Sequence, residues 1–229
     1  MDKESKQYAG PFTYVAAALV IGLFITFLIL MYCINSEVEF SWEKPIQVYF
    51  QNWNTGIGNS FFTYWTELGS YNGVLVATAC LVAWLWWKYR DYSALLVVPM
   101  TVFLTNKINV FVKGLVGRER PMINPAIDAT GYSFPSGHAM LSVVTYGFAI
   151  YLLSKYAKNT KETFFIWVAG IVLIITIGIS RVVLSAHFPS DVFAGYCLGV
   201  VILVLSVKLY KILSSWIKKK RSPETGTKS

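Results

Sequence analysis

Six long apolar stretches dominate the sequence, and each comes close to the roughly 20 residues that a helix needs to cross a membrane. They lie at residues 12–34, 71–87, 93–115, 138–154, 164–184 and 191–213. Hydrophobic residues make up 55% of the chain and charged residues only 14%, which excludes an ordinary soluble domain. The sequence therefore predicts an all-α integral membrane bundle of six transmembrane helices, forming a single domain over residues 1–229.

The first stretch follows Lys3 and Lys6 and so resembles a secretory signal peptide. Its apolar run is too long for an ordinary signal sequence, and residues 33–36 make a poor small-residue cleavage site. We therefore expect an uncleaved first span. The three cysteines have neither paired nor metal-ligand spacing, so we expect buried apolar residues rather than disulfide partners.

Basic residues are distributed unevenly between the two sides of the membrane. With the N-terminus inside, 14 of the 20 Lys and Arg residues fall in cytoplasmic segments. The positive-inside rule therefore predicts that both termini are cytoplasmic and that the polar clusters described below face outward from the plasma membrane. Insertion and contact with anionic lipid account for the net charge of +8, so no nucleic-acid partner is expected. The polar tail, residues 222–229, is expected to be disordered.

Two other regions are polar or aromatic in an apolar context. Residues 45–70 mix aromatic side chains with Gln, Asn, Thr and Gly, which is typical of a segment lying in the membrane interface. Lys107 lies inside the third span, near Asn106 and Asn109. Because polar groups at that depth usually face protein or water, we expect Lys107 to make an internal polar contact.

The first polar cluster consists of Lys113 and Arg120, seven residues apart at the end of the third span. If the helix continues, both side chains lie on one face, about 10 Å apart along the axis, and can converge on one anion. Gly114 and Gly117 weaken the helix and Pro121 ends it, so the loop 121–135 would cross the mouth of the site. The alternative is that both cations are ordinary interface anchors.

The second cluster is Pro135-Ser136-Gly137-His138, where a loop enters the fourth span. Ser136 suits a helix N-cap, and Gly137 allows backbone N–H groups to approach a ligand closely. A helix N-terminus favours an anion, toward which His138 would then face as a proton donor. The alternative is a capping turn with an incidental histidine.

The third cluster contains Ser180, Arg181, His187 and Asp191. Pro189 suits the first position of the sixth helix, and the helix dipole stabilises Asp191 in its first turn. From there Asp191 can accept a hydrogen bond from one ring nitrogen of His187 and leave a lone pair on the other. A purely structural His–Asp pair is the alternative, but it accounts for neither Arg181 nor the other two clusters.

Together the three blocks resemble the signature of the type 2 phosphatidic acid phosphatase superfamily, and within it the bacterial phosphatidylglycerophosphatase B proteins with six helices. The motifs span about 80 residues, from Lys113 to Asp191. The resemblance implies that His187 is a nucleophile that becomes a phosphohistidine, that Asp191 orients it, and that His138 protonates the leaving alkoxide. It also implies which residues hold the phosphate oxygens: Lys113, Arg120, Ser136, Gly137 and Arg181. Neither a metal nor another cofactor is expected, because cations replace Mg²⁺ as the charge clamp.

The sequence thus predicts an enzyme, a membrane phosphatase whose partners are the lipid bilayer and a phospholipid or polyprenyl phosphate. The favoured substrate, phosphatidylglycerophosphate, follows from the resemblance alone. One alternative is an undecaprenyl pyrophosphate phosphatase in cell-wall carrier recycling, and another is a non-catalytic lipid-binding or transport protein. A soluble vanadate-dependent haloperoxidase is excluded by the six apolar spans. The sequence leaves the oligomeric state open.

Overall fold

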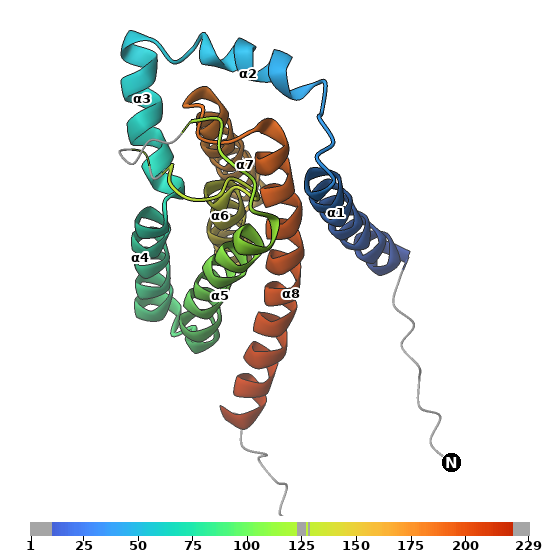
Figure 1. Cartoon of the computed structure of the whole chain (residues 1–229). Helices are drawn as coiled ribbons and strands as arrows, with labels where there is room; N and C mark the ends of the chain where they lie inside the picture. The colour runs from blue at the N-terminus through green and yellow to red at the C-terminus, as the bar shows by residue number, and fades with distance from the viewer. Residues whose placement is uncertain (1–10, 123–126, 128, 222–229) are drawn as a thin grey trace, which may run out of the picture.

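The computed structural model describes residues 11–122, 127 and 129–221, and most of the backbone in these residues is helical (Figure 1). Within these residues, eight α-helices and one short 3-10 helix follow one another. Their bounds are α1 Pro11–Asn35, α2 Glu43–Gln51, α3 Gly56–Thr66, η1 Glu67–Gly69, α4 Tyr71–Tyr89, α5 Tyr92–Val116, α6 Gly137–Tyr156, α7 Thr160–Val183 and α8 Pro189–Arg221.

The helices confirm the predicted six-span bundle, with one refinement. α1, α5, α6, α7 and α8 are each long and apolar enough to cross a membrane. The predicted span at 71–87 corresponds to α4, which meets that standard only together with Gly56–Gly69, across a bend of 57°. Part of the expected interface segment is therefore the first arm of a bent span, whereas α2 lies across the end of the bundle (Figure 1).

α6 is the centre of the bundle. Of its most apolar stretch 67% is buried, against 39% for α5 and α8, 17% for α7 and 11% for α1, so α7 and α1 expose the largest share of their apolar surface to lipid. One core cluster lies toward α1 and includes Phe27, Phe134 and Met140. A second joins α4, α5, α6 and α8 and includes Leu85 and Phe148. Both clusters use α6 as their common wall.

The end of the bundle opposite α2 is held by a buried carboxylate. Asp91 caps α5 by accepting from the backbone N–H of Ala94 at 3.1 Å, and it also binds Lys155 at 3.1 Å and Tyr156 at 2.8 Å. Tyr210 of α8 donates to the same carboxylate. Burial raises the pKa of Asp91, but these hydrogen bonds outweigh it and hold the pKa below its usual value. This network fixes α5, α6 and α8 to one another.

Several sequence-based expectations need correction or lie outside the described residues. All three cysteines are free, but only Cys197 is buried; Cys33 is half-buried and Cys80 is exposed. Lys107 makes no internal polar contact of the expected kind, because its side chain is exposed and lies 5.4 Å from the ring of Phe103. The helix winds Lys107 away from the bundle interior, so snorkelling explains its position better. The tail 222–229 lies outside the described residues.

Candidate active site

The three polar clusters meet at the end of the bundle that α2 covers. The loop between α5 and α6 crosses this end and meets the short turn between α7 and α8 (Figure 1). Between them lies a cavity of about 260 Å³. Five of the predicted site residues line it: Lys113, Arg120, Gly137, His138 and His187. Ser136, Arg181 and Asp191 lie behind this lining.

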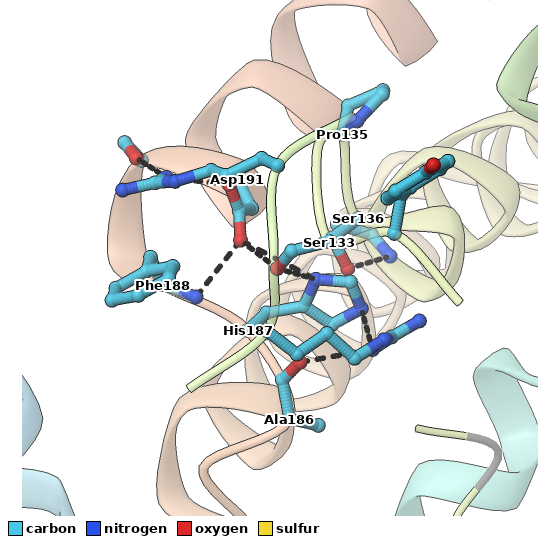
Figure 2. A network of polar contacts seen from close by, with 12 residues as sticks. Ser133, Pro135, Ser136, Ala186, His187, Phe188 and Asp191 are labelled. Atoms are coloured by element: carbon cyan, nitrogen blue, oxygen red, sulfur yellow. Dashed lines mark hydrogen bonds and ion pairs between the residues drawn. The ribbon is translucent and has the colours of Figure 1, made fainter. Parts of the chain in front are cut away.

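Asp191 stands in the first turn of α8, beside the imidazole of His187 (Figure 2). Its Oδ2 atom lies 3.5 Å from His187 Nδ1 and accepts the backbone N–H of Phe188 at 2.9 Å. The hydroxyl of Ser133 donates to the same oxygen and also lies 3.3 Å from Nδ1. The separation of 3.5 Å is long for a direct hydrogen bond, so Ser133 completes the link between carboxylate and imidazole.

The contacts of His187 define its tautomer. Nη1 of Arg120 lies 3.0 Å from Nε2, and a guanidinium can only donate hydrogen bonds. Nε2 therefore carries the lone pair, and the ring proton is on Nδ1, facing Ser133 and Asp191. This is the tautomer in which Nε2 can act as a nucleophile.

Burial and nearby cations keep His187 neutral. Its side chain is almost completely buried, and burial lowers its pKa well below the usual 6.5. The positive charges of Lys113, Arg120 and Arg181 lower that pKa further. Because the neutral form predominates above the lowered pKa, the lone pair on Nε2 is present throughout the neutral pH range.

His138 is the second imidazole of the cavity. It lies in the first turn of α6, and only 5% of its surface is exposed. Its Nε2 atom makes no hydrogen bond to any residue that the structure describes. A buried polar atom of this kind carries a desolvation cost that a bound ligand would relieve. The lining of the cavity thus includes a ring nitrogen available to a substrate.

The start of α6 follows the sequence prediction. Ser136 is the N-cap and accepts from the backbone N–H of Ala139 at 3.4 Å, while its own N–H donates to the carbonyl of Asp191 at 2.9 Å. A Cβ atom at Gly137 would come within 2.9 Å of Asn109 Oδ1, so a larger residue would force the Asn109 side chain, which donates to the carbonyl of Pro135, to shift. The helix N-terminus therefore stands directly at the cavity, where its dipole favours an anion.

The two cations of the first cluster reach the cavity by a different route from the predicted one. α5 ends at Val116, and Gly117 adopts a left-handed conformation with φ 68°, so the helix does not continue to Arg120. Lys113 donates from the last turn of α5 to the carbonyl of Tyr132 at 2.8 Å. Arg120, in the loop, donates to the carbonyls of Thr130, Gly131 and Ala186. The loop therefore brings Arg120 to the cavity without helical spacing.

Arg181 is fully buried behind the cavity. Its Nη1 donates to the hydroxyl of Thr66 at 2.8 Å, and its Nη2 donates to the carbonyl of Ile127 at 2.9 Å. These bonds fasten the end of α7 to α3 and to the loop between α5 and α6. Arg181 therefore adds positive charge next to the histidines and also holds the elements that surround them.

Sequence reasoning missed a clamp on Asp191. Nη1 of Arg118 lies 2.7 Å from Asp191 Oδ1 and 2.7 Å from the hydroxyl of Ser190. Its Nη2 lies 2.8 Å from Glu43 Oε2 in α2, and the guanidinium stacks 3.9 Å from the ring of Phe188. Arg118 is only two residues from Arg120, and this spacing could have marked it as a site residue. Nothing in the sequence points to Glu43 or Ser133.

The described residues contain no group of three or more His, Cys, Asp or Glu side chains arranged to hold a metal ion. The buried carboxylates at this end, Glu43 and Asp191, are instead paired with Arg118. An incoming phosphate would thus meet cations and N–H donors. Such a set suits phosphoryl transfer in which protein groups stabilise the charge.

The chain is similar to known proteins in both sequence and fold. The family model of the PAP2 superfamily matches residues 94–214. Phosphatidylglycerophosphatase B of Bacillus subtilis is 30% identical over 194 residues, covering 81% of this chain and 91% of that protein. The crystal structure of the PAP2 type phosphatidylglycerolphosphate phosphatase from Bacillus subtilis superposes with a TM-score of 0.77 at 26% identity, covering 85% of this chain and 96% of that one. An undecaprenyl-diphosphatase of Sulfolobus acidocaldarius is 40% identical over 80 residues, which is 35% of this chain and 34% of that protein.

Replacing Arg118 by Ala should destabilise the protein strongly. It would leave the buried carboxylates of Glu43 and Asp191 without their shared counter-charge, a change that costs about 3–5 kcal/mol in comparable buried pairs. Reversible unfolding in mixed micelles would measure the loss. Lys44→Ala, an exposed neighbour of Glu43, is the matched control and should change stability by less than about 0.5 kcal/mol. Equal stability of the two variants would show that the clamp contributes nothing.

Proposed function

The chain belongs to the PAP2 superfamily and is a membrane lipid phosphatase, and we propose that it hydrolyses phosphatidylglycerophosphate to phosphatidylglycerol through a phosphohistidine on His187. The observation that carries the chemistry is the state of His187. Its lone pair is on Nε2, its proton is directed at Ser133 and Asp191, and it shares a cavity with a second imidazole.

In the proposed first step, Nε2 of His187 attacks phosphorus and the bond from phosphorus to the glycerol oxygen breaks. The leaving alkoxide takes a proton from His138, and the phosphoryl group stays on His187. Arg120 now donates to Nε2 at 3.0 Å, so it must turn its guanidinium to a phosphate oxygen before attack. Substrate binding would therefore release the nucleophile as well as position the electrophile.

In the proposed second step, water attacks the phosphohistidine. His138, now neutral, takes the proton from the water, the P–N bond breaks, and inorganic phosphate leaves. Asp191 stabilises the positive charge that develops on the imidazole whenever Nε2 bonds to phosphorus. The cations and the N-terminus of α6 hold the non-bridging oxygens, and such preorganised donors are each worth about 10²–10³ in rate. We assign this binding role to Lys113, Arg120, Ser136, Gly137 and Arg181.

The position of the cavity supports a lipid substrate. Its wall includes Asn106 and Val110 of α5 and Tyr71 of α4, so it extends along membrane-spanning helices. Val110 lines the cavity and is also 59% exposed on the outer surface of α5. A phosphate headgroup can occupy the cavity while its acyl chains remain in the bilayer. The glycerol headgroup is favoured because phosphatidylglycerophosphatase B of Bacillus subtilis is similar over most of both chains.

A polyprenyl pyrophosphate is the second candidate. The 80-residue similarity to an undecaprenyl-diphosphatase favours it, since a site that binds a terminal phosphoryl group suits either substrate. A non-catalytic lipid-binding protein fits less well, because anion binding alone does not need a neutral, oriented imidazole. We further propose that the protein lies in the plasma membrane, with the site facing outward and both termini in the cytoplasm, on the basis of the 14 basic residues in the opposite segments.

Purified protein should release inorganic phosphate from phosphatidylglycerophosphate with a higher kcat/KM than from undecaprenyl pyrophosphate. Activity should persist in excess EDTA, because Lys113 and Arg120 already supply the charge that Mg²⁺ supplies elsewhere. Phosphate release from a panel of lipid phosphates measures both expectations. A reversed preference would select the pyrophosphate, and a requirement for Mg²⁺ restored by titration would contradict the proposed charge clamp.

A phosphoenzyme should form on His187 during turnover. Rapid acid-free quenching with ³²P-labelled substrate should trap an acid-labile, base-stable label, and peptide mapping should locate it at His187. His187→Ala should lose the label and nearly all turnover. His138→Ala is the matched control, since it keeps the nucleophile and should still accept label from an activated substrate. Label on any other residue would overturn the assignment.

The two histidines should respond differently to the leaving group. Protonation matters most for a poor leaving group, so His138→Ala should lose more activity on phosphatidylglycerophosphate than on p-nitrophenyl phosphate. His187→Ala should lose both activities alike. Steady-state kinetics under conditions where chemistry limits the rate would test this. Equal fractional losses for His138→Ala would remove its role as general acid.

The orientation can be tested with single cysteines in a variant that lacks the three native ones. Glu39, between α1 and α2, and Lys158, between α6 and α7, are both exposed and lie at opposite ends of the bundle. An impermeant thiol reagent should label Glu39→Cys in intact cells and Lys158→Cys only after lysis. The reverse pattern would place the site on the cytoplasmic face.

A further inference from the structure

A second cavity, separate from the active site, runs along the seam between α7 and α8. Its volume is about 500 Å³, and α6 forms its floor. It shares no lining residue with the cavity that holds the two histidines. Aliphatic side chains form most of its walls, among them Ile171, Ile174, Val200, Leu203 and Val204.

Two glycines explain why this groove exists. A Cβ atom at Gly147 of α6 would lie 2.3 Å from Leu203 of α8, and one at Gly170 of α7 would lie 2.4 Å from Ile150 of α6. Glycine at these positions lets both α7 and α8 pack closely on α6. The two outer helices are thereby held to α6 rather than to each other, and a gap remains between them.

The two ends of the groove differ. Toward the active site, the hydroxyl of Tyr196 donates to the carbonyls of Ile174 at 2.9 Å and Ile175 at 3.1 Å, which ties α8 to α7. At the other end, the lining includes Lys208 and Lys211, which lie about one turn apart on α8 and are both exposed. The Nζ atom of Lys211 also lies 5.6 Å from the ring of Tyr151. The groove is therefore apolar along its length and cationic at its mouth.

The depth of the two lysines fits a membrane surface. They follow Pro189, the first residue of α8, by 19 and 22 positions, which corresponds to roughly 28–33 Å along the helix. The hydrocarbon core of a bilayer is about 30 Å thick. If the start of α8 lies at one surface, Lys208 and Lys211 lie where the headgroups of the opposite leaflet begin.

We propose that this groove binds a phospholipid from the leaflet opposite the active site. One acyl chain lies between α7 and α8, and the anionic headgroup pairs with Lys208 and Lys211. The apolar walls disfavour a polar peptide, and the paired cations favour an anionic phospholipid over a zwitterionic one. A second copy of this chain is a poorer occupant, because the groove ends in the positive charges of Lys208 and Lys211.

Native mass spectrometry of the whole protein in detergent tests the proposal, with phosphatidylserine and phosphatidylcholine of identical acyl chains as probes. We expect phosphatidylserine to bind more tightly than phosphatidylcholine. The double variant Lys208→Ala/Lys211→Ala should lower the affinity for phosphatidylserine about 10–30-fold, because each lysine attracts the anionic headgroup. Lys219→Ala/Lys220→Ala, which removes two charges from α8 beyond the groove lining, is the control and should bind as the wild type does. Val204→Trp should fill the groove and abolish binding of both lipids there. Leu205→Trp is its control, because the neighbouring Leu205 is 57% exposed and does not line the groove, and this variant should still bind both lipids.

Size-exclusion profiles and unfolding temperatures show whether each variant is folded, independently of phosphatase activity. The test therefore remains valid if the proposed substrate is wrong. The proposal would be overturned if the two lipids bound with equal affinity. It would also be overturned if Lys219→Ala/Lys220→Ala lowered the affinity as much as Lys208→Ala/Lys211→Ala. A dimer that Val204→Trp dissociates would overturn it as well, because a second copy of the chain would then occupy the groove.

Discussion

The buried carboxylate of Asp191 is the constraint on which the site depends. A carboxylate inside a membrane protein is tolerated only with strong partners, and Asp191 has Arg118, Ser133 and the backbone N–H of Phe188. Satisfying Asp191 fixes the first turn of α8, the loop between α5 and α6, and the turn that carries His187. The imidazole is oriented because the groups around the carboxylate have little freedom. Since Arg118 also binds Glu43, α2 belongs to the same assembly.

The remaining cations are preorganised in a different way. Lys113 and Arg120 donate to loop carbonyls, which are weaker partners than carboxylates. A phosphate can compete with these carbonyls for the two side chains, whereas Arg118 is already neutralised by two acids. This difference gives Arg118 and Arg120, two residues apart, distinct functions in the proposed mechanism. Arg118 maintains the structure around the nucleophile, and Arg120 remains able to exchange Nε2 of His187 for a substrate oxygen.

The sequence predicted what local patterns determine. Hydropathy located the six helices, and the three clusters identified both histidines, Asp191 and the cations around the cavity. It failed where distant segments decide the outcome. Gly117 ends α5, so Arg120 reaches the cavity on a loop rather than on the predicted helix. Ser133 and Glu43 gain their importance only when folding brings them to α8, and no spacing rule reveals such contacts. Lys107 was expected to make an internal polar contact because it is a charge inside a membrane span, but the direction of its side chain is set by helix packing.

α8 connects the site to the other end of the bundle. Apolar burial provides little specificity between helices in lipid, so small residues and buried polar bonds must determine their relative positions. α8 is held near its start by the partners of Asp191 and farther along by Tyr210, which donates to Asp91. These two polar anchors fix its position along the bundle and its rotation against α6. The same rotation that directs Asp191 at the imidazole also turns Lys208 and Lys211 toward the groove beside α7. A lipid bound there would thus contact the helix that carries Asp191.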